Sequence, residues 1–201
     1  MPKTAIGRIL VASLHQAIAD ILPMRLGFYE NWLHVDGLRE GRIGLAPLHA
    51  VLSFLRQEGE AYESIMNRAG EYAAEWTVPS ISRVERVILR ASPTWLRGRL
   101  LLRVARQLVR SSYEGSRAVS TIRRGTARID VRASIFCTVR EPVDHPLCGY
   151  YAAAFTRLLT LFEVPARAVV VACRGTGKPS CVLQIALAHR ARRDGTQVEA
   201  A

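Results

Sequence analysis

The chain has 201 residues, of which 49% are apolar, so it can bury one sizeable core and is not disordered in bulk. Its net charge of +11 fits contact with nucleic acid, an anionic membrane face or an acidic partner, and equally well a merely solubilising surface. Four cysteines in this length do not indicate a secreted disulfide scaffold, and no run reaches the roughly 20 apolar residues of a membrane span. We therefore expect a cytoplasmic protein that can associate with a membrane surface.

The first half of the chain predicts helices. Apolar residues recur at helical spacing in four stretches that prolines or glycines delimit: 4–22, 47–58, 60–76 and 93–113. Residues 24–45 predict a short helix and a loop, because Gly37, Gly41 and Gly44 interrupt the pattern. Residues 82–91 mix apolar residues with arginines and fit either a helix or a strand.

The second half of the chain predicts strands around one helix. Two segments with β-branched residues, 118–124 and 126–139, predict a hairpin. An apolar helix over 147–162 follows, and a second strand pair, 168–173 and 181–188, encloses a glycine-rich turn. This order predicts an α+β domain with an antiparallel sheet of about four strands covered by helices.

Three cysteines in the last third of the chain share a layout that can bring their sulfur atoms together. Cys148 opens the apolar helix, whereas Cys173 and Cys181 flank the glycine-rich turn. Thiolates suit zinc, and the alternative is a group of buried core cysteines. We expect Cys137 to be an inward-facing strand residue, so Cys173→Ser should lower stability more than Cys137→Ser.

Aromatic residues on apolar faces could line a pocket for a hydrophobic molecule, although such residues more often belong to the core. The residues that we select as the pocket lining are Trp76, Phe136, Tyr151 and Phe155. No catalytic residue is predicted, because the H-E-x-x-H, G-x-S-x-G and G-x-G-x-x-G patterns are absent and the neighbouring Asp144 and His145 are a common loop pair. The chain is therefore predicted to bind a ligand rather than to catalyse a reaction.

The predicted helix over 93–113 carries a stripe of arginines that includes Arg99, Arg103 and Arg110. A solvated helix face is the first interpretation of this stripe. The second is peripheral contact with an anionic membrane, because basic amphipathic helices lie at such surfaces. Nucleic acid is the least favoured partner, since aromatic residues are sparse around the arginines and no named binding motif is present.

Several of these segments resemble the 4-vinyl reductase domain, a family related to Bet3-like subunits of the TRAPP complex. The similar segments are 148–151, 172–177 and 180–185, with weaker likeness at 55–59 and 66–70. The resemblance implies a TRAPP-subunit-like α+β fold and a homodimer formed through N-terminal helices. It divides the chain into an N-terminal helical extension (1–44), a ligand-binding domain (45–190) and a polar tail (191–201).

The resemblance also implies a zinc site. Zinc-bearing members hold the metal with three cysteines and one acidic residue, and the cysteines carry over onto Cys148, Cys173 and Cys181. Val170 stands at the acidic position, so the fourth ligand has to come from elsewhere: His145, Asp144, Cys137 or a water molecule.

The leading functional hypothesis is a non-enzymatic module that binds or senses a hydrophobic or aromatic small molecule. As a homodimer without an attached output domain, it would signal through a partner. The alternatives that the resemblance implies are a tetrapyrrole (bacteriochlorophyll) pathway protein of the 4-vinyl reductase type and a TRAPP-like assembly or membrane-tethering subunit.

Overall fold

The computed structural model describes residues 6–33 and 44–187. Most helices precede the sheet in the chain, and one lies between its two hairpins. The helices are α1 (Arg8–Ile21), α2 (Leu26–Leu33), α4 (Leu45–Leu55), α5 (Glu60–Thr77), α6 (Arg83–Ala91), α7 (Thr94–Ser112) and α8 (Gly149–Leu161). Short 3-10 turns join them: η1 (Pro23–Arg25), η2 (Arg56–Glu58), η3 (Val78–Ser80), η4 (Ile135–Cys137) and η5 (Arg174–Thr176).

The described residues form one four-stranded antiparallel sheet in the order β1-β2-β4-β3. Its strands are β1 (Arg117–Arg123), β2 (Thr126–Arg132), β3 (Ala168–Ala172) and β4 (Cys181–Ala186). Arg124 and Gly125 join β1 to β2 with φ angles of 46° and 78°, as a two-residue turn between right-twisted strands requires. The predicted α+β class and four-stranded antiparallel sheet are confirmed.

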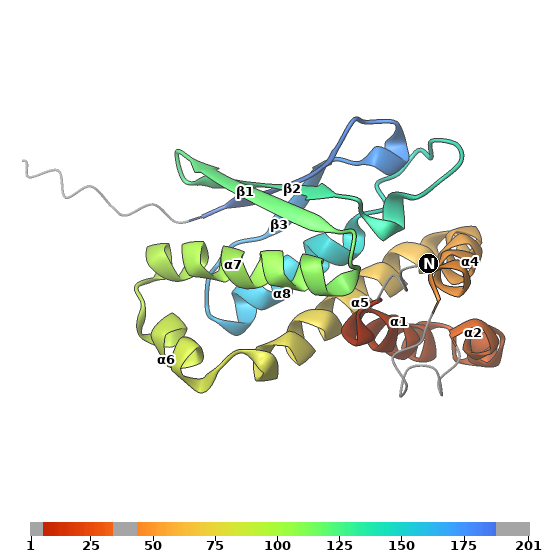
Figure 1. Cartoon of the computed structure of the whole chain (residues 1–201), viewed down its shortest axis with the longest axis horizontal. Coiled ribbons are helices and arrows are strands. Elements are labelled where there is room, and N and C mark those ends of the chain that lie inside the picture. The colour runs from red at the N-terminus through yellow and green to blue at the C-terminus, as the bar shows by residue number, and fades with distance from the viewer. Residues whose placement is uncertain (1–5, 34–43, 188–201) are drawn as a thin grey trace, which may run out of the picture.

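Helices cover one face of the sheet. α7 and α8 lie beneath the strands, and α5 and α1 lie below them (Figure 1). Side chains on β2 follow this arrangement, because Ile129 and Val131 are buried against the helices while Arg128 and Arg132 are exposed on the other face. The core therefore lies between the sheet and the helical layer.

Helices α5 and α8 approach closely at Gly70. A Cβ atom at this position would lie 2.3 Å from the carbonyl oxygen of Tyr150 and 2.9 Å from the Cβ of Ala153. Both distances are below van der Waals contact, so only glycine lets the two backbones reach this separation. The crossing positions the N-terminal turn of α8, where Cys148 lies.

Helix α1 shares the core with the rest of the described chain. Its Leu10, Leu14 and Ile18 are buried, and the Gly7 N–H donates to the Ser112 carbonyl at the end of α7. The predicted division at residue 44 remains a prediction, and the proposed tail lies outside the described residues. No single described helix is long and apolar enough to cross a bilayer; the segments Arg8–Ile21 and Pro23–Leu33 meet that criterion only as a pair bent by 117°.

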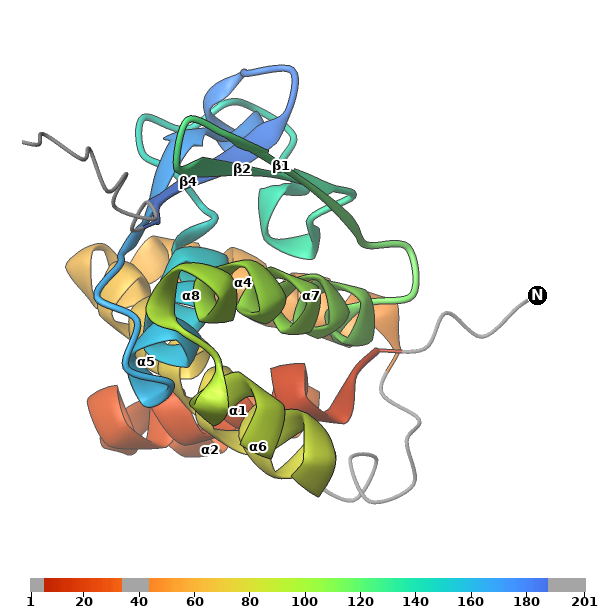
Figure 2. The ribbon, with the colours of Figure 1, turned by 90° about the vertical axis from the view of Figure 1, so that its left-hand side faces the viewer.

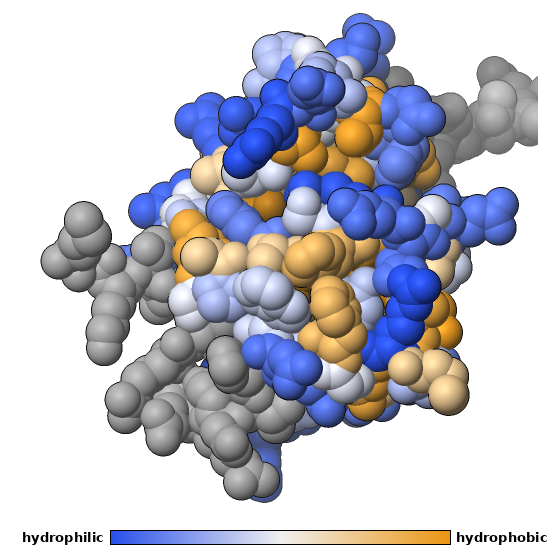
Figure 3. Space-filling model, turned by 90° about the vertical axis from the view of Figure 1, so that its right-hand side faces the viewer, coloured by the Kyte–Doolittle hydropathy of each residue, from blue (hydrophilic) through white to orange (hydrophobic). Residues whose placement is uncertain are grey.

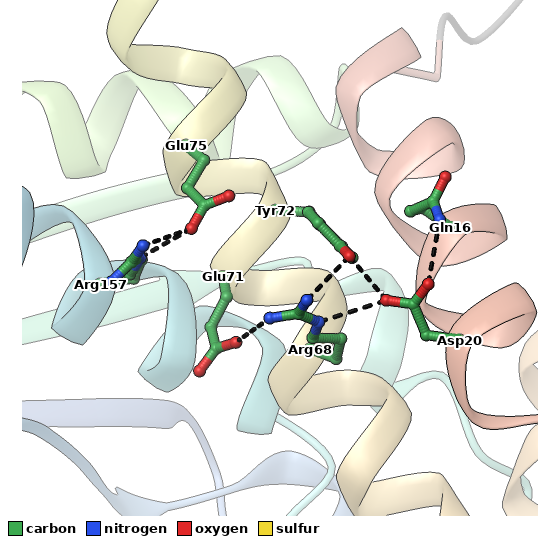
Figure 4. A network of polar contacts seen from close by, with 7 residues as sticks. All are labelled: Gln16, Asp20, Arg68, Glu71, Tyr72, Glu75 and Arg157. Atoms are coloured by element: carbon green, nitrogen blue, oxygen red, sulfur yellow. Dashed lines mark hydrogen bonds and ion pairs between the residues drawn. The ribbon is translucent and has the colours of Figure 1, made fainter.

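A polar network ties α1, α5 and α8 together on the solvent side (Figure 4). Asp20 of α1 accepts hydrogen bonds from the Tyr72 hydroxyl at 2.6 Å and from Arg68 Nε at 3.3 Å. Further along α5, Glu75 pairs with Arg157 of α8, whose Nε lies 2.8 Å from Glu75 Oε1. Hydrogen bonds from Tyr72 and Gln16 hold the pKa of Asp20 below its ordinary value of 3.8.

The structure decides one open prediction, for residues 82–91, and corrects another, for residues 126–139. Residues 82–91, which fit helix or strand, form α6 with a Ser82 N-cap whose hydroxyl accepts from the Glu85 N–H. The second predicted strand, 126–139, ends early at Arg132. Ala133 adopts a positive φ of 51°, which turns the chain out of the sheet, and Cys137 falls in η4 rather than on a strand.

Candidate metal centre and adjoining pocket

Four buried cysteine side chains meet at one end of the sheet: Cys137, Cys148, Cys173 and Cys181. Their sulfur atoms all lie within 4.8 Å of one another. Cys137 Sγ lies 3.1 Å from Cys148 Sγ, 3.3 Å from Cys173 Sγ and 3.4 Å from Cys181 Sγ. The three cysteines selected from the sequence are thus brought together, and Cys137 completes the set.

Each sulfur comes from a different local structure. Cys137 ends η4, Cys148 is the residue before α8, Cys173 lies between β3 and η5, and Cys181 begins β4. The η4 turn is fixed to the helices by Arg56, whose Nη2 donates to the Phe136 carbonyl at 3.0 Å. Because each cysteine is positioned by its own segment, the four sulfur atoms can bind the same metal ion.

Backbone N–H groups point at the sulfur atoms. The Leu147 N–H donates to Cys173 Sγ at 3.3 Å, and the Arg174 N–H donates to Cys181 Sγ at 3.4 Å. Such bonds stabilise the thiolate more than the thiol, and outer hydrogen bonds of this kind orient metal ligands.

Because the four thiols lie close together, their pKa values shift in opposite directions. Hydrogen bonds from Cys137 and Cys148 lower the pKa of Cys173 well below that of an ordinary thiol. The pKa of Cys148 is raised, mainly by its hydrogen bond to Cys137 and then by its contact with Cys173. Four neighbouring thiolates repel one another, so full ionisation of the cluster needs a cation among the sulfurs.

The donor set fits a tetrahedral metal ion. Zinc in a four-thiolate site has Zn–S distances of about 2.3 Å, which puts the sulfurs roughly 3.8 Å apart. Four of the six sulfur–sulfur distances are 3.1–3.7 Å and all six are within 4.8 Å, so shifts of up to about an ångström would give this geometry. The cluster can therefore bind a metal, and the set of four soft ligands is closed, as in structural sites.

A pocket of about 440 Å³ adjoins the cysteine cluster between α5, the start of α8 and the edge strand β3. Its lining combines apolar and small residues with polar and charged ones. The lining residues that matter below are Tyr62, Glu63, Met66, Asn67, His145, Pro146, Gly149, Ala152, Arg167 and Val170. The volume falls in the range of small-molecule sites.

One loop belongs to both the pocket and the cysteine cluster. His145 and Pro146 line the pocket, while the next two residues contribute the N–H to Cys173 and the Cys148 sulfur. From the opposite wall, the Tyr62 hydroxyl donates to the Leu147 carbonyl at 3.5 Å. No pattern in the sequence identified this pocket, because its walls come from three segments far apart in the chain.

The aromatic residues selected from the sequence are only partly brought together. Phe136 lies 5.3 Å from Tyr151, and Tyr151 lies 6.3 Å from Phe155, by ring centroids, within the buried core. Trp76 lies elsewhere, 37% exposed and stacked on Tyr72 at 5.3 Å. Tyr72 and Trp76 are spaced i and i+4, so they lie on the same outward side of α5.

Two buried phenol groups lie near serine hydroxyls without a well-formed hydrogen bond. Among the described residues, the hydroxyls of Tyr150 and Tyr151 have no partner at hydrogen-bond geometry, and neither has the Ser134 hydroxyl. Ser13, close to Tyr150, donates instead to the Leu10 carbonyl at 3.0 Å. Burial raises the pKa of Tyr150 to about 12 and also raises the pKa of Tyr151, so both phenols stay neutral at physiological pH.

The Asp144–His145 pair lies at the pocket rim. His145 Nδ1 is 2.7 Å from Asp144 Oδ1, and both side chains are exposed to solvent. The hydrogen bond from His145 lowers the pKa of Asp144. Because both side chains are open to water, the pair lies on the surface beside the pocket rather than in a shielded site.

No family model matches the chain, and no curated protein matches it either. Among solved structures, an H-NOX protein from Shewanella oneidensis in the Fe(II)NO state matches with a TM-score of 0.58 and 11% identity, over 92% of this chain and 100% of that one. A second Shewanella oneidensis H-NOX structure, in the Fe(II)CO state, gives 0.56 and 11% over the same shares.

A third match is the phenol-responsive sensory domain of the transcription activator PoxR, bound to phenol. Its TM-score is 0.50 at 14% identity, over 71% of this chain and 74% of that one. Likeness at these identities establishes a shared fold. The chain thus shares its fold with these H-NOX structures and with the PoxR domain.

The resemblance to the 4-vinyl reductase domain and to Bet3-like TRAPP subunits is wrong. The solved structures reported above are H-NOX proteins and a phenol-responsive sensory domain, and none is described as a 4-vinyl reductase or a TRAPP subunit. Short cysteine- and glycine-containing segments around a helix and a hairpin recur in unrelated folds, so their similarity could not identify a family. The tetrapyrrole-pathway and TRAPP-like tethering alternatives lose their basis with it.

Proposed function

We propose that the chain is the ligand-binding module of a small-molecule sensor, and that it acts without catalysing a reaction. The observation that carries the proposal is the loop shared by the pocket and the cysteine cluster. A ligand that displaces His145 or Pro146 must act on Leu147 and Cys148, which the cluster holds. Occupancy of the pocket can thereby reach the sheet, and a partner that contacts the sheet would receive the signal.

The fold supports the same function. One structural match is described as phenol-responsive and another as an Fe(II)NO complex, so this architecture serves small-molecule recognition elsewhere. For the present chain we propose a molecule with an aromatic or aliphatic body and one polar or anionic group. Met66, Ala152 and Val170 would contact the body, and Asn67 and Arg167 would bind the polar group.

We assign zinc to the four cysteines. Cys137, Cys148, Cys173 and Cys181 would hold it, and Cys137 would take the place of the acidic ligand that Val170 cannot supply. When bound, the ion supplies a cross-link between η4, α8 and both strands of the second hairpin. A closed four-thiolate set leaves no open position for substrate, which supports a structural role.

Metal analysis tests the assignment. The protein purified with a reductant should contain about one zinc per chain, and Co²⁺ substitution should give the visible spectrum of a four-thiolate site. Cys137→Ser should lose one thiolate from that spectrum, whereas Ser134→Ala, a change in the same turn, should leave it intact. Metal-free protein that is fully folded would contradict the assignment.

Ligand binding can be tested at Ala152, which lines the pocket. The probe is 1-anilinonaphthalene-8-sulfonate, because it combines an aromatic body with an anionic group. Ala152→Trp should fill the pocket and abolish saturable binding, whereas Ala186→Trp, on the open face of the sheet, should not. Equal binding by both variants, with unchanged melting, would place the probe elsewhere and contradict the pocket assignment.

Self-association through the N-terminal helices stays part of the proposal. The side of the molecule that carries α2 and α4 shows broad apolar areas edged by hydrophilic groups (Figure 3). Phe28 and Trp32 of α2 are 47% and 39% exposed and contact Phe54 of α4, with centroids 5.2 and 5.6 Å away. Trp32→Ser should dissociate a dimer in sedimentation experiments if this surface forms it.

A further inference from the structure

The apolar side of helix α6 faces solvent instead of the core. Only Leu89 of its nine residues is buried, whereas Val84, Val87 and Ile88 are 69%, 66% and 52% exposed. These three residues are spaced i, i+3 and i+4, so they form one apolar stripe. Such stripes normally bury the helix against its own domain.

Caps and backbone contacts, rather than burial, hold α6 in place. The Ser82 hydroxyl caps its first turn, and the Ser92 hydroxyl donates to the Ile88 carbonyl at 2.7 Å. Arg97 of α7 donates to the carbonyls of Arg90 and Ser92 at 2.8 and 3.0 Å. A helix this short is unstable alone, so these bonds fix it with its apolar stripe outward.

Arginines surround the stripe. α6 carries three arginines and one glutamate, and the neighbouring α7 carries five arginines and no acidic residue. Within the described part of the chain, no ion pair involves Arg83, Arg103 or Arg110. Both helices lie at the front of the molecule when it is viewed from its α6 side, with no other described segment covering them (Figure 2).

A cleft joins the apolar and basic parts of this surface. It has a volume of about 310 Å³ and lies between Val84 and Ile88 of α6 and Leu100 and Arg103 of α7. Elsewhere on α6, the Nε of Arg86 is buried and has no hydrogen-bond partner within the described chain. A protruding apolar stripe next to unpaired arginines is the combination that anionic bilayers attract: apolar groups enter the headgroup region, and arginines bind the phosphates.

We propose that the α6–α7 surface binds an anionic lipid bilayer, with Val87 and Ile88 inserted and the α7 arginines on the headgroups. A neutral protein surface would contact the apolar stripe and an acidic one would contact the arginines. An anionic bilayer binds both, because it has an apolar interior and phosphate headgroups. The site is separate from the pocket and from the cysteine cluster, so the proposed sensor function can fail without affecting it.

Vesicle flotation of the full chain tests the proposal. Wild-type protein should float with vesicles of phosphatidylcholine and phosphatidylserine at low salt, and not with phosphatidylcholine alone. Arg99→Gln/Arg103→Gln should weaken binding roughly 30-fold, at about 1 kcal/mol per arginine. Val87→Ser/Ile88→Ser should weaken it at least tenfold at any salt concentration.

Matched controls lie on the sheet. Val169→Ser/Val171→Ser and Arg123→Gln/Arg128→Gln change the same kinds of exposed residue elsewhere and should bind like wild type. Equal losses in the control pairs, or no binding of wild type to anionic vesicles, would overturn the proposal. So would a wild-type dimer that Val87→Ser/Ile88→Ser dissociates while vesicle binding is unchanged, because the stripe would then contact a second copy.

Discussion

At the scale of single residues, Cys137 has the largest effect on the interpretation of the chain. As a strand residue it would be a replaceable core side chain, but its sulfur lies within 3.4 Å of three other sulfurs. Cys137→Ser should therefore lower the free energy of unfolding about as much as Cys173→Ser, by more than about 2 kcal/mol for each. Chemical denaturation with a reductant present checks this.

The expectation that Cys173 matters more than Cys137 is replaced by this one. Ser134→Ala serves as the control, because it alters the same turn without touching a sulfur. If Cys137→Ser unfolds like wild type while Cys173→Ser does not, the cluster works with three cysteines.

The unpaired phenols lead to a prediction of opposite sign. Removing a buried hydroxyl that has no partner relieves a desolvation cost, so Tyr150→Phe and Tyr151→Phe should each raise stability, by about 1 kcal/mol. Tyr62→Phe should instead lower it, since the Tyr62 hydroxyl bonds to Leu147. Thermal melts of the three variants provide the comparison, and a loss of stability in Tyr151→Phe would indicate a bound partner such as water.

At the scale of elements, the close crossing of α5 and α8 depends on Gly70, which has no side chain. Gly70→Ala should cost about 3 kcal/mol, because its Cβ would overlap the Tyr150 carbonyl and neither helix can move freely. Gly27→Ala, in α2, is the matched control. A Cβ there meets nothing within 4 Å, so the better helix former should be neutral or stabilising. Similar melting of the two variants would show that α8 can shift.

The contact between α1 and α5 should depend on pH. Because the pKa of Asp20 is lower in the folded chain than its ordinary 3.8, its carboxylate adds stability above that value. The contribution disappears as the pH falls through the folded-state pKa. Asp20→Asn should thus cost up to about 1 kcal/mol at neutral pH and almost nothing near pH 2. Urea denaturation at both pH values measures it, and a pH-independent difference would contradict it.

At the scale of the whole molecule, the cysteine cluster joins segments at one end only. Chelation of the metal should raise amide exchange in 135–148 and 173–181, while α1 and α5 stay protected by their own core. Hydrogen exchange followed by mass spectrometry resolves these segments. Uniform loss of protection would mean that the metal supports the entire fold.

Local signals in the sequence predicted most of the architecture. The helical periods of α5, α7 and α8 and the glycine turn between β1 and β2 are short-range patterns, and the structure follows them. Residues 133–139 were mispredicted because the β-branched run hides the turn at Ala133, whose positive φ no residue type there announces. The outward stripe of α6 shows the limit of periodicity, which defines a face but not what covers it.

The candidate site was predicted less completely, for a reason of geometry. Cys148, Cys173 and Cys181 could be grouped because a helix start and a hairpin have definite ends. The fourth sulfur and the pocket depend on how the loop before α8 folds back, which only the packed chain determines. Trp76 was selected as a pocket-lining residue, but it lies on the outer face of α5, where it stacks on Tyr72 and is 37% exposed.

The positions of the four cysteines along the chain have a consequence for synthesis in the cell. All of them lie between residues 137 and 181, whereas α1 to α7 lie before residue 113. Since domains begin to fold from their N-terminal end as they leave the ribosome, the helical layer can form before the last thiol is translated. A metal ion can bind all four thiolates only after Cys181 has been translated, and zinc starvation would then leave new molecules with a formed helical layer and a sheet whose end is not cross-linked.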